Sequence, residues 1–153
     1  DQGAQDFGTE GKDLMIEIRV AGTPAPQGSK RFVGHAKSGR GIMIESSAKV
    51  KPWREAVKWA AMELHLAAPM QGPLAVEMIF GLARPKSAPK KRIYPDRKPD
   101  LSKLVRSTED ALTDAGIWGD DAQVVRCEAA KTFAGAGMPL VFPGAIIRVR
   151  RIE

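Results

Sequence analysis

Three carboxylates stand near the two ends of one predicted helix. Asp100 opens that helix, and Asp120 and Asp121 lie in the turn that follows it. Clustered carboxylates repel one another and cost folding free energy unless a cation offsets them. Oxygen ligands of this kind suit Mg²⁺, which activates water and stabilises a charged phosphoryl transition state. The pattern favours a metal site for phosphodiester chemistry, provided that the strand after the turn runs back alongside the helix.

A purely structural interpretation of the same residues stays open. Asp100 follows a proline and precedes an apolar helical stripe, so it also suits a helix N-cap. Gly119 and the two aspartates after it would form a turn without any metal. Asp110, on the same helix, lies four residues after Arg106, which is the spacing of a helical ion pair.

Composition and charge narrow the class of protein. The 153 residues allow one domain with a hydrophobic core, and 24 Lys+Arg against 18 Asp+Glu give a net charge of +6. This excess favours an acidic partner such as nucleic acid. The sequence has neither a secretory signal pattern nor an apolar run near the roughly 20 residues of a membrane helix. Cys127 is the single cysteine, so no intramolecular disulfide is possible, which fits a reducing compartment. Together with the lack of a membrane-helix pattern, this leads us to expect a cytoplasmic protein without membrane association.

Hydrophobic periodicity predicts a single α+β domain over residues 15–153, after a terminal tail at 1–14. The segment 16–20 alternates like a half-buried strand, and 52–67 and 100–115 have helical stripes. The order is strand, hairpin, helix, strand, helix, strand, strand, which predicts one mixed β-sheet covered by two main helices. The remaining strands are expected at 30–33, 42–45, 74–82, 123–133 and 145–152.

A long basic loop separates the third predicted strand region from the second helix. Residues 84–99 contain four prolines and seven Lys/Arg, and loops of this length are usually functional or disordered. Its charge favours contacts with phosphates, although a solvated linker stays open as an interpretation. The candidate nucleic-acid-binding residues are Lys30, Arg31, Lys90, Lys91, Arg92, Lys98 and Lys103.

Longer motifs resemble one known family. The block Arg97-Lys98-Pro99-Asp100-Leu101-Ser102-Lys103-Leu104, followed by the segment 110–125 with its Gly-Asp-Asp-Ala-Gln-Val-Val ending, is similar to the RusA family. The earlier segment 22–31, rich in Pro, Gly and basic residues, resembles the N-terminal motif of that family. These are small, dimeric, Mg²⁺-dependent Holliday-junction endonucleases, often carried by phages and prophages.

The resemblance implies roles for particular residues. Asp100 matches the family's first essential aspartate and Asp121 the later one, while Asp120 is an additional candidate ligand of Mg²⁺ (or Mn²⁺). Arg106 stands at the position of a functionally important lysine, so it keeps the charge but cannot act as a proton donor. Asp100, Asp121 and Arg106 are therefore the implied catalytic residues.

Ser102 departs from the family pattern, because an aspartate is typical at this position. A serine hydroxyl is neutral, so one negative charge is missing from the implied site, and Lys103 stands where asparagine is common. Either the chain is deficient in cleavage while still binding junctions, or Asp120 compensates, or the protein has been repurposed for DNA binding alone.

The expected function is resolution of four-way DNA junctions by paired phosphodiester cleavage, impaired by Ser102 to an extent that the sequence does not fix. The alternative is a non-catalytic protein of the same fold that binds branched DNA, and a general nucleic-acid-binding domain is a third possibility. Because symmetric cleavage of two strands needs two sites related by a twofold axis, we expect a homodimer. Its place of action would be inside a bacterial or phage-infected cell.

Overall fold

A computed structural model describes residues 14–28, 30–35, 41–45 and 48–152, with backbone alone for 30–35 and 41–45. The predicted tail at 1–14 lies almost entirely outside the described residues, as does the tip of the predicted hairpin. In the described parts, no helix is both long and apolar enough to cross a membrane.

Four strands form one mixed sheet, as the sequence predicted. They are β1 (Met15–Ala21), β4 (Leu74–Leu82), β5 (Val124–Phe133) and β6 (Gly144–Arg151), and their order across the sheet is β1-β6-β4-β5. Strand β6 is antiparallel to both β1 and β4, whereas β4 and β5 are parallel. A parallel pair requires a crossover connection, and here a helix supplies it. The β5 strand is left at one edge of the sheet.

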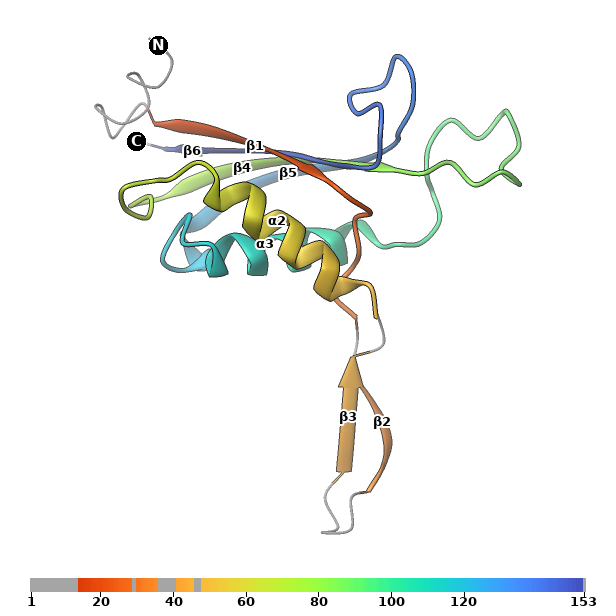
Figure 1. Cartoon of the computed structure of the whole chain (residues 1–153), viewed down its shortest axis with the longest axis horizontal. Helices are drawn as coiled ribbons and strands as arrows, with labels where there is room; N and C mark the ends of the chain where they lie inside the picture. The colour runs from red at the N-terminus through yellow and green to blue at the C-terminus, as the bar shows by residue number, and fades with distance from the viewer. Residues whose placement is uncertain (1–13, 29, 36–40, 46–47, 153) are drawn as a thin grey trace.

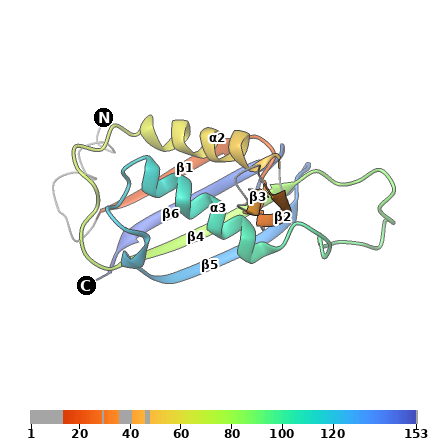
Figure 2. The same ribbon diagram turned by 90° about the horizontal axis from the view of Figure 1, so that it is seen from below.

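Two helices, α2 (Val50–Met62) and α3 (Leu101–Asp114), cover the same face of the sheet (Figures 1 and 2). Helix α2 is shorter than the predicted 52–67 and begins two residues earlier, whereas α3 agrees with the prediction to within one residue at each end. Strands β2 (Lys30–His35) and β3 (Gly41–Glu45) form a separate antiparallel hairpin, also as predicted.

The core lies between the helices and the sheet. Trp53 of α2 is 1% exposed and packs near Phe80 of β4, with a ring-centroid distance of 6.5 Å. Its indole N–H donates to the Thr108 hydroxyl of α3 at 3.1 Å. This bond satisfies both buried polar groups and joins the two helices, so α3 has a fixed position over β4 and β5.

The opposite face of the sheet is charged. Arg148 of β6 donates to Glu17 of β1 at 2.8 Å and to Glu77 of β4 at 2.9 Å. The two carboxylates raise the pKa of the Arg148 guanidinium. The helices therefore cover one face of the sheet, and the ion-paired cluster lies on the other face beside the buried apolar residues Ala75 and Ile146.

Candidate functional site

Asp100 lies at the N-terminus of α3, beside an open cleft of about 450 Å³. Its backbone carbonyl accepts from the amides of Lys103 and Leu104, both at 3.1 Å. Its side chain makes no capping hydrogen bond, so the carboxylate is not consumed in starting the helix. The Lys103 ammonium lies 3.9 Å from the carboxylate, and both side chains are about half-exposed. An N-cap role for the Asp100 side chain is therefore not what the structure shows.

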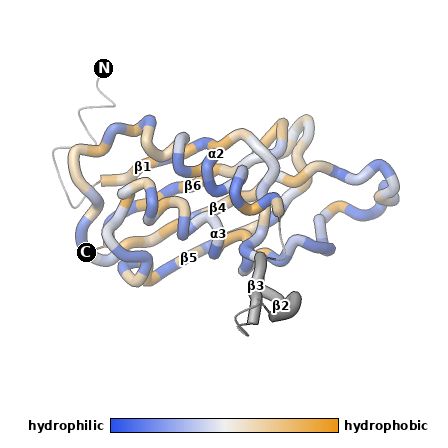
Figure 3. The backbone as a smooth tube through the Cα atoms, turned by 60° about the horizontal axis from the view of Figure 1, so that its bottom comes forward, coloured by the Kyte–Doolittle hydropathy of each residue, from blue (hydrophilic) through white to orange (hydrophobic). Residues whose placement is uncertain are grey.

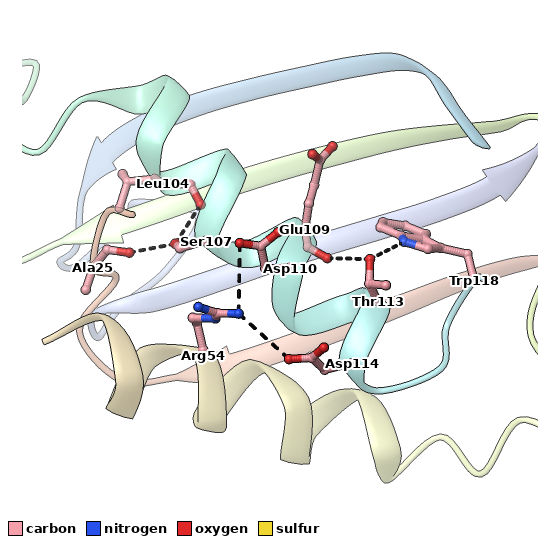
Figure 4. Close-up of polar contacts among 9 residues, drawn as sticks. All are labelled: Ala25, Arg54, Leu104, Ser107, Glu109, Asp110, Thr113, Asp114 and Trp118. Atoms are coloured by element: carbon pink, nitrogen blue, oxygen red, sulfur yellow. Dashed lines mark hydrogen bonds and ion pairs between the residues drawn. The ribbon is translucent and has the colours of Figure 1, made fainter. Parts of the chain in front are cut away.

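The cleft beside Asp100 is lined by two segments far apart in sequence and by Lys49, just before α2. The segment 23–28 forms one wall, and basic and proline residues near the helix start form the other. The Gln27 amide donates to the Lys103 carbonyl at 2.9 Å, and the buried Ser107 hydroxyl donates to the Ala25 carbonyl at 2.7 Å (Figure 4). These contacts hold the Pro- and Gly-rich motif against the Asp100 motif.

Lys131 of β5 fixes the backbone that leads into Asp100. Its ammonium donates to the carbonyls of Arg97 and Pro99, each at 2.9 Å, and the Lys98–Pro99 peptide bond is cis. An ammonium shared between two carbonyls holds both in one orientation. Lys131 therefore sets where the helix, and with it Asp100, begins.

Asp120 and Asp121 lie in the short 3-10 helix segment that precedes β5. The Asp120 carboxylate accepts from the Ala122 amide at 2.8 Å, and the Gln123 side chain accepts from the amides of Gly119 and Asp120. Gln123 also donates to the Met70 and Gly72 carbonyls, both at 3.0 Å. The turn is thus a reciprocal capping box, and the Asp120 carboxylate has a structural partner within it.

Asp121 faces a shallow hollow at the C-terminal end of α3, together with Asp110 and Asp114. Arg54 of α2 lies 3.9 Å from the Asp110 carboxylate and 3.8 Å from that of Asp114 (Figure 4). The expected helical partner of Asp110 was Arg106, but the ion pair is formed across helices. Arg54 lies near Asp110 because helix α2 runs beside α3 at the position of Asp110 and Asp114.

The sequence prediction that Asp100 and Asp121 converge is not fulfilled within one chain. Helix α3 has 14 residues, which at about 1.5 Å of rise per residue separates its ends by roughly 21 Å. Because β5 is parallel to β4, both strands begin at the same end of the sheet. Asp100 lies at the opposite end, near Lys131 of β5. Asp121, just before β5, is therefore near the C-terminus of α3 and away from Asp100. Mg²⁺ binds its ligands at about 2.0–2.1 Å, so one ion cannot bridge them. Among the described residues, no group of three His, Cys, Asp or Glu side chains could hold a metal.

Glu109 is a site residue that sequence reasoning missed. Burial raises the pKa of its carboxyl, and the nearby Asp121 and Asp110 carboxylates raise it further, while Arg106 opposes them. The signal was present: Glu109 lies four residues after Val105, a member of the inward helical stripe, so it had to sit at the border of the buried face. Glu109 therefore belongs to the same acidic group as Asp121, toward the C-terminal end of α3.

The predicted DNA-binding residues differ in how exposed they are and in whether the structure describes their side chains. Lys90, Lys91 and Lys98 are exposed in the loop 83–100, which projects beyond the C-terminal ends of β4 and β5, on the Asp100 side (Figures 2 and 3). Arg92 is more enclosed, with its guanidinium 3.9 Å from Asp96. The side chains of Lys30 and Arg31 lie outside the described residues.

The basic loop is braced from within. The Arg84 guanidinium donates to the carbonyls of Arg92 at 2.7 Å and Pro89 at 2.6 Å, and it lies over the Phe133 ring at 4.8 Å. These contacts curl the loop and leave its lysines at the surface. These contacts order the loop next to Asp100, and the contact of its lysines with phosphates stays a prediction.

Comparison with known proteins decides the family. The endodeoxyribonuclease RusA family matches residues 21–141, which is most of the described fold. The chain belongs to the RusA family. It is 29% identical over 109 residues to the crossover junction endodeoxyribonuclease of Enterobacteria phage 82, covering 71% of this chain and 78% of that protein. It is also 30% identical to the RusA protein of Shigella sonnei and 29% identical to that of Escherichia coli K12. Each match again covers 71% of this chain and 78% of the relative.

The RusA match covers the residues that build both ends of α3. It includes the segment 23–28, the basic loop, Asp100, the capping box and Lys131. Ser102 lies in the first turn of α3, exposed and two residues after Asp100. The hydroxyl of Ser102 is neutral, so this turn of the helix carries one carboxylate fewer than an aspartate at position 102 would give it.

Proposed function

We propose that this protein is a Mg²⁺-dependent homodimeric endonuclease that resolves four-way DNA junctions by paired cleavage. The observation that carries the proposal is the Asp100 carboxylate, which makes no capping hydrogen bond and lies at the mouth of a cleft beside a braced, lysine-rich loop, in a chain of the RusA family. The relatives with the same core are named as crossover junction endodeoxyribonucleases. Branched DNA would be its substrate, inside a bacterial or phage-infected cell.

The proposed roles follow from position and charge. Asp100 and Asp121 are the acidic groups assigned to the divalent cation; because one chain holds them at opposite ends of α3, the two would have to come from different subunits of the proposed homodimer. Asp120 is limited to a supporting role because its carboxylate already caps a turn. Mg²⁺, or Mn²⁺ in its place, would supply an activated water and charge stabilisation at the phosphate. Arg106 keeps a positive charge on the exposed surface of α3. Lys90, Lys91 and Lys98 would neutralise phosphates of the DNA arms, together with Lys30, Arg31, Arg92 and Lys103.

Cleavage of a synthetic four-way junction tests the proposal. The protein with Mg²⁺ should introduce symmetrically paired nicks, and Ser102→Asp should increase the rate by about tenfold or more if the missing carboxylate limits activity. Ser102→Asn, which has a similar size and no charge, is the matched control. A protein that neither binds nor cleaves junctions at low salt would overturn the proposal.

A second candidate, junction binding without cleavage, is favoured by one observation. The Lys103 ammonium lies 3.9 Å from the Asp100 carboxylate and competes there with a metal cation. This candidate predicts structure-selective binding without nicking in either Mg²⁺ or Mn²⁺. Robust nicking by the unmodified chain would eliminate it.

A further inference from the structure

A second pocket, of about 210 Å³, lies next to the Asp100 cleft. Pro24 and Pro99 line both hollows, so they belong to a common wall. Much of the remaining lining is apolar: Leu82 and Phe133, the last residues of β4 and β5, are 8% and 7% exposed. The pocket is smaller than the roughly 300–1,000 Å³ of sites for drug-sized ligands, so it suits a single flat ring system.

The walls of this pocket are held in place by hydrogen bonds within the protein. The Arg84 guanidinium donates to the Arg92 carbonyl at 2.7 Å, and the Lys131 ammonium donates to the carbonyls of Arg97 and Pro99. Arg92, Arg97 and Pro99 all line the pocket. Its shape is therefore set in the free protein, which lowers the cost of binding a ligand there.

The lining of the pocket is also positively charged. Arg92, Arg97 and Lys98 contribute to it, and Asp96 lies 3.9 Å from the Arg92 guanidinium and 3.6 Å from that of Arg97. Three cations against this one carboxylate leave an excess of two positive charges, which attracts phosphates. Apolar walls combined with cations match one nucleotide of a DNA strand, a flat base flanked by phosphates.

We propose that this pocket receives one unstacked base of the strand whose phosphate lies at Asp100, and that it thereby distinguishes branched from duplex DNA. The inference rests on the proposed nuclease function and names the part of the substrate that the protein recognises. The common wall of Pro24 and Pro99 places the pocket directly beside the cleft, where a neighbouring nucleotide of the same strand would lie.

The selectivity follows from the stacking of bases. Removing a base from a continuous stack costs free energy, and the cost is least where pairing and stacking are already interrupted. A branch point is such a place, whereas an intact duplex offers no free base. A duplex would therefore occupy the cleft with the pocket empty, and a branched strand would fill both.

Filling the pocket with a side chain tests the proposal without relying on cleavage. Ala83 lines the pocket, is exposed and directly follows β4, so Ala83→Phe should occupy the pocket and leave the core intact. In the presence of a chelator, the affinity for a synthetic four-way junction should fall by about tenfold, the contribution of one stacked base, and that for duplex by less than about twofold. Ala68→Phe, at an exposed alanine before the other end of β4, is the matched control and should change neither. An unchanged junction affinity, or equal losses for junction and duplex, would overturn the proposal.

A junction that lacks one base identifies the ligand. Abasic sites are placed in turn at the nucleotides next to the branch point, and one of them should lower the affinity of the unmodified protein by about tenfold. That junction should show no further loss with Ala83→Phe, because both changes remove the same contact. Losses that add, or the lack of any sensitive position, would mean that no base enters the pocket.

A fluorescent base separates the fate of this proposal from that of the nuclease. The emission of 2-aminopurine in a short single strand increases when the base leaves the stack, so it should rise with the unmodified protein and not with Ala83→Phe. Tyr94→Ala is the control for stacking on the loop surface, since Tyr94 is 72% exposed, and loss of the response with Tyr94→Ala alone would overturn the pocket. A junction preference that survives Ala83→Phe would also overturn the pocket and leave the proposed nuclease standing. Uptake of the single strand by a protein that neither binds nor cleaves junctions would count against the nuclease and leave the base pocket standing.

Discussion

The two ends of α3 hold their acidic residues in opposite ways. At the N-terminal end one carboxylate, Asp100, stands among basic residues and beside an open cleft. At the C-terminal end several carboxylates gather, and most are already engaged: Asp120 caps a turn, and Arg54 lies between Asp110 and Asp114. The basic end suits an incoming phosphate backbone, whereas the negative charge of the acidic end is partly offset by Arg54. Neither end alone has what a metal-dependent nuclease requires.

The largest expected effect comes from neutralising one carboxylate at each end. Asp100→Asn and Asp121→Asn should each lower junction cleavage by more than about 100-fold, because either loses a group that would hold the cation. Asp114→Asn should change it by less than about threefold, since that carboxylate is 57% exposed and faces Arg54. Rates with a four-way junction and Mg²⁺ provide the measurement. A severe defect from Asp114→Asn and none from Asp121→Asn would reverse the assignment at the acidic end.

Lys131→Met should have the next largest effect and should act on the basic end. Without the ammonium, the Arg97 and Pro99 carbonyls lose their shared donor, and the segment leading into Asp100 loosens. Removal of such a supporting contact commonly lowers activity by about 10–100-fold. The rate at saturating junction should fall more than the affinity, and Lys51→Met, at an exposed position of α2, is the matched loss of charge. An equal fall for both variants would mean that Lys131 contributes only charge.

The fold was largely predictable because its elements follow from periodicity. The strand at 74–82 and the helix at 100–115 have strong patterns and short, distinctive boundaries, and both were confirmed to within one residue. Helix α2 ends five residues before its predicted limit, where the chain turns and His65 adopts a positive φ of 52°. A local pattern of apolar residues does not encode that turn.

The arrangement of the predicted site residues could not be read from the sequence. Motif spacing singled out Asp100 and Asp121, yet spacing along the chain does not say whether a strand begins at the near or the far end of a helix. The parallel pairing of β4 and β5 decides this, and it depends on long-range contacts. The Asp110 partner was mistaken for the same reason, because Arg54 comes from another helix. Sequence-local reasoning therefore misjudged which of these side chains lie close together, and their roles stay predictions.

A smaller effect is expected from Arg54→Met, which removes the cation that the acidic end already possesses. Its two ion pairs are long, at 3.8 and 3.9 Å, and about one-third or more of each side chain is exposed. Pairs of this kind contribute roughly 0–1 kcal/mol, so the free energy of unfolding should fall by less than about 1 kcal/mol. Urea denaturation at two salt concentrations measures it. A loss that persists unchanged at high salt would indicate packing of the arginine stem rather than charge.

The smallest effect, Glu109→Gln, isolates the repulsion within the acidic end. The pKa of the Glu109 carboxyl is raised by burial and by the nearby Asp121 and Asp110 carboxylates, so the folded state favours its protonated form. Native stability contributed by that proton is present below the unfolded pKa and is lost as the pH rises through the raised folded pKa. The variant, which is neutral at every pH, should therefore be more stable than wild type near pH 7–8 and about equally stable near pH 4. Urea denaturation at both pH values checks the sign, and a variant that is less stable at pH 8 would show that Glu109 is paired with a cation there.

The same comparison with Mg²⁺ present sharpens the contrast between the ends of α3: if a bound cation relieves the repulsion, the advantage of glutamine at pH 8 should shrink or reverse.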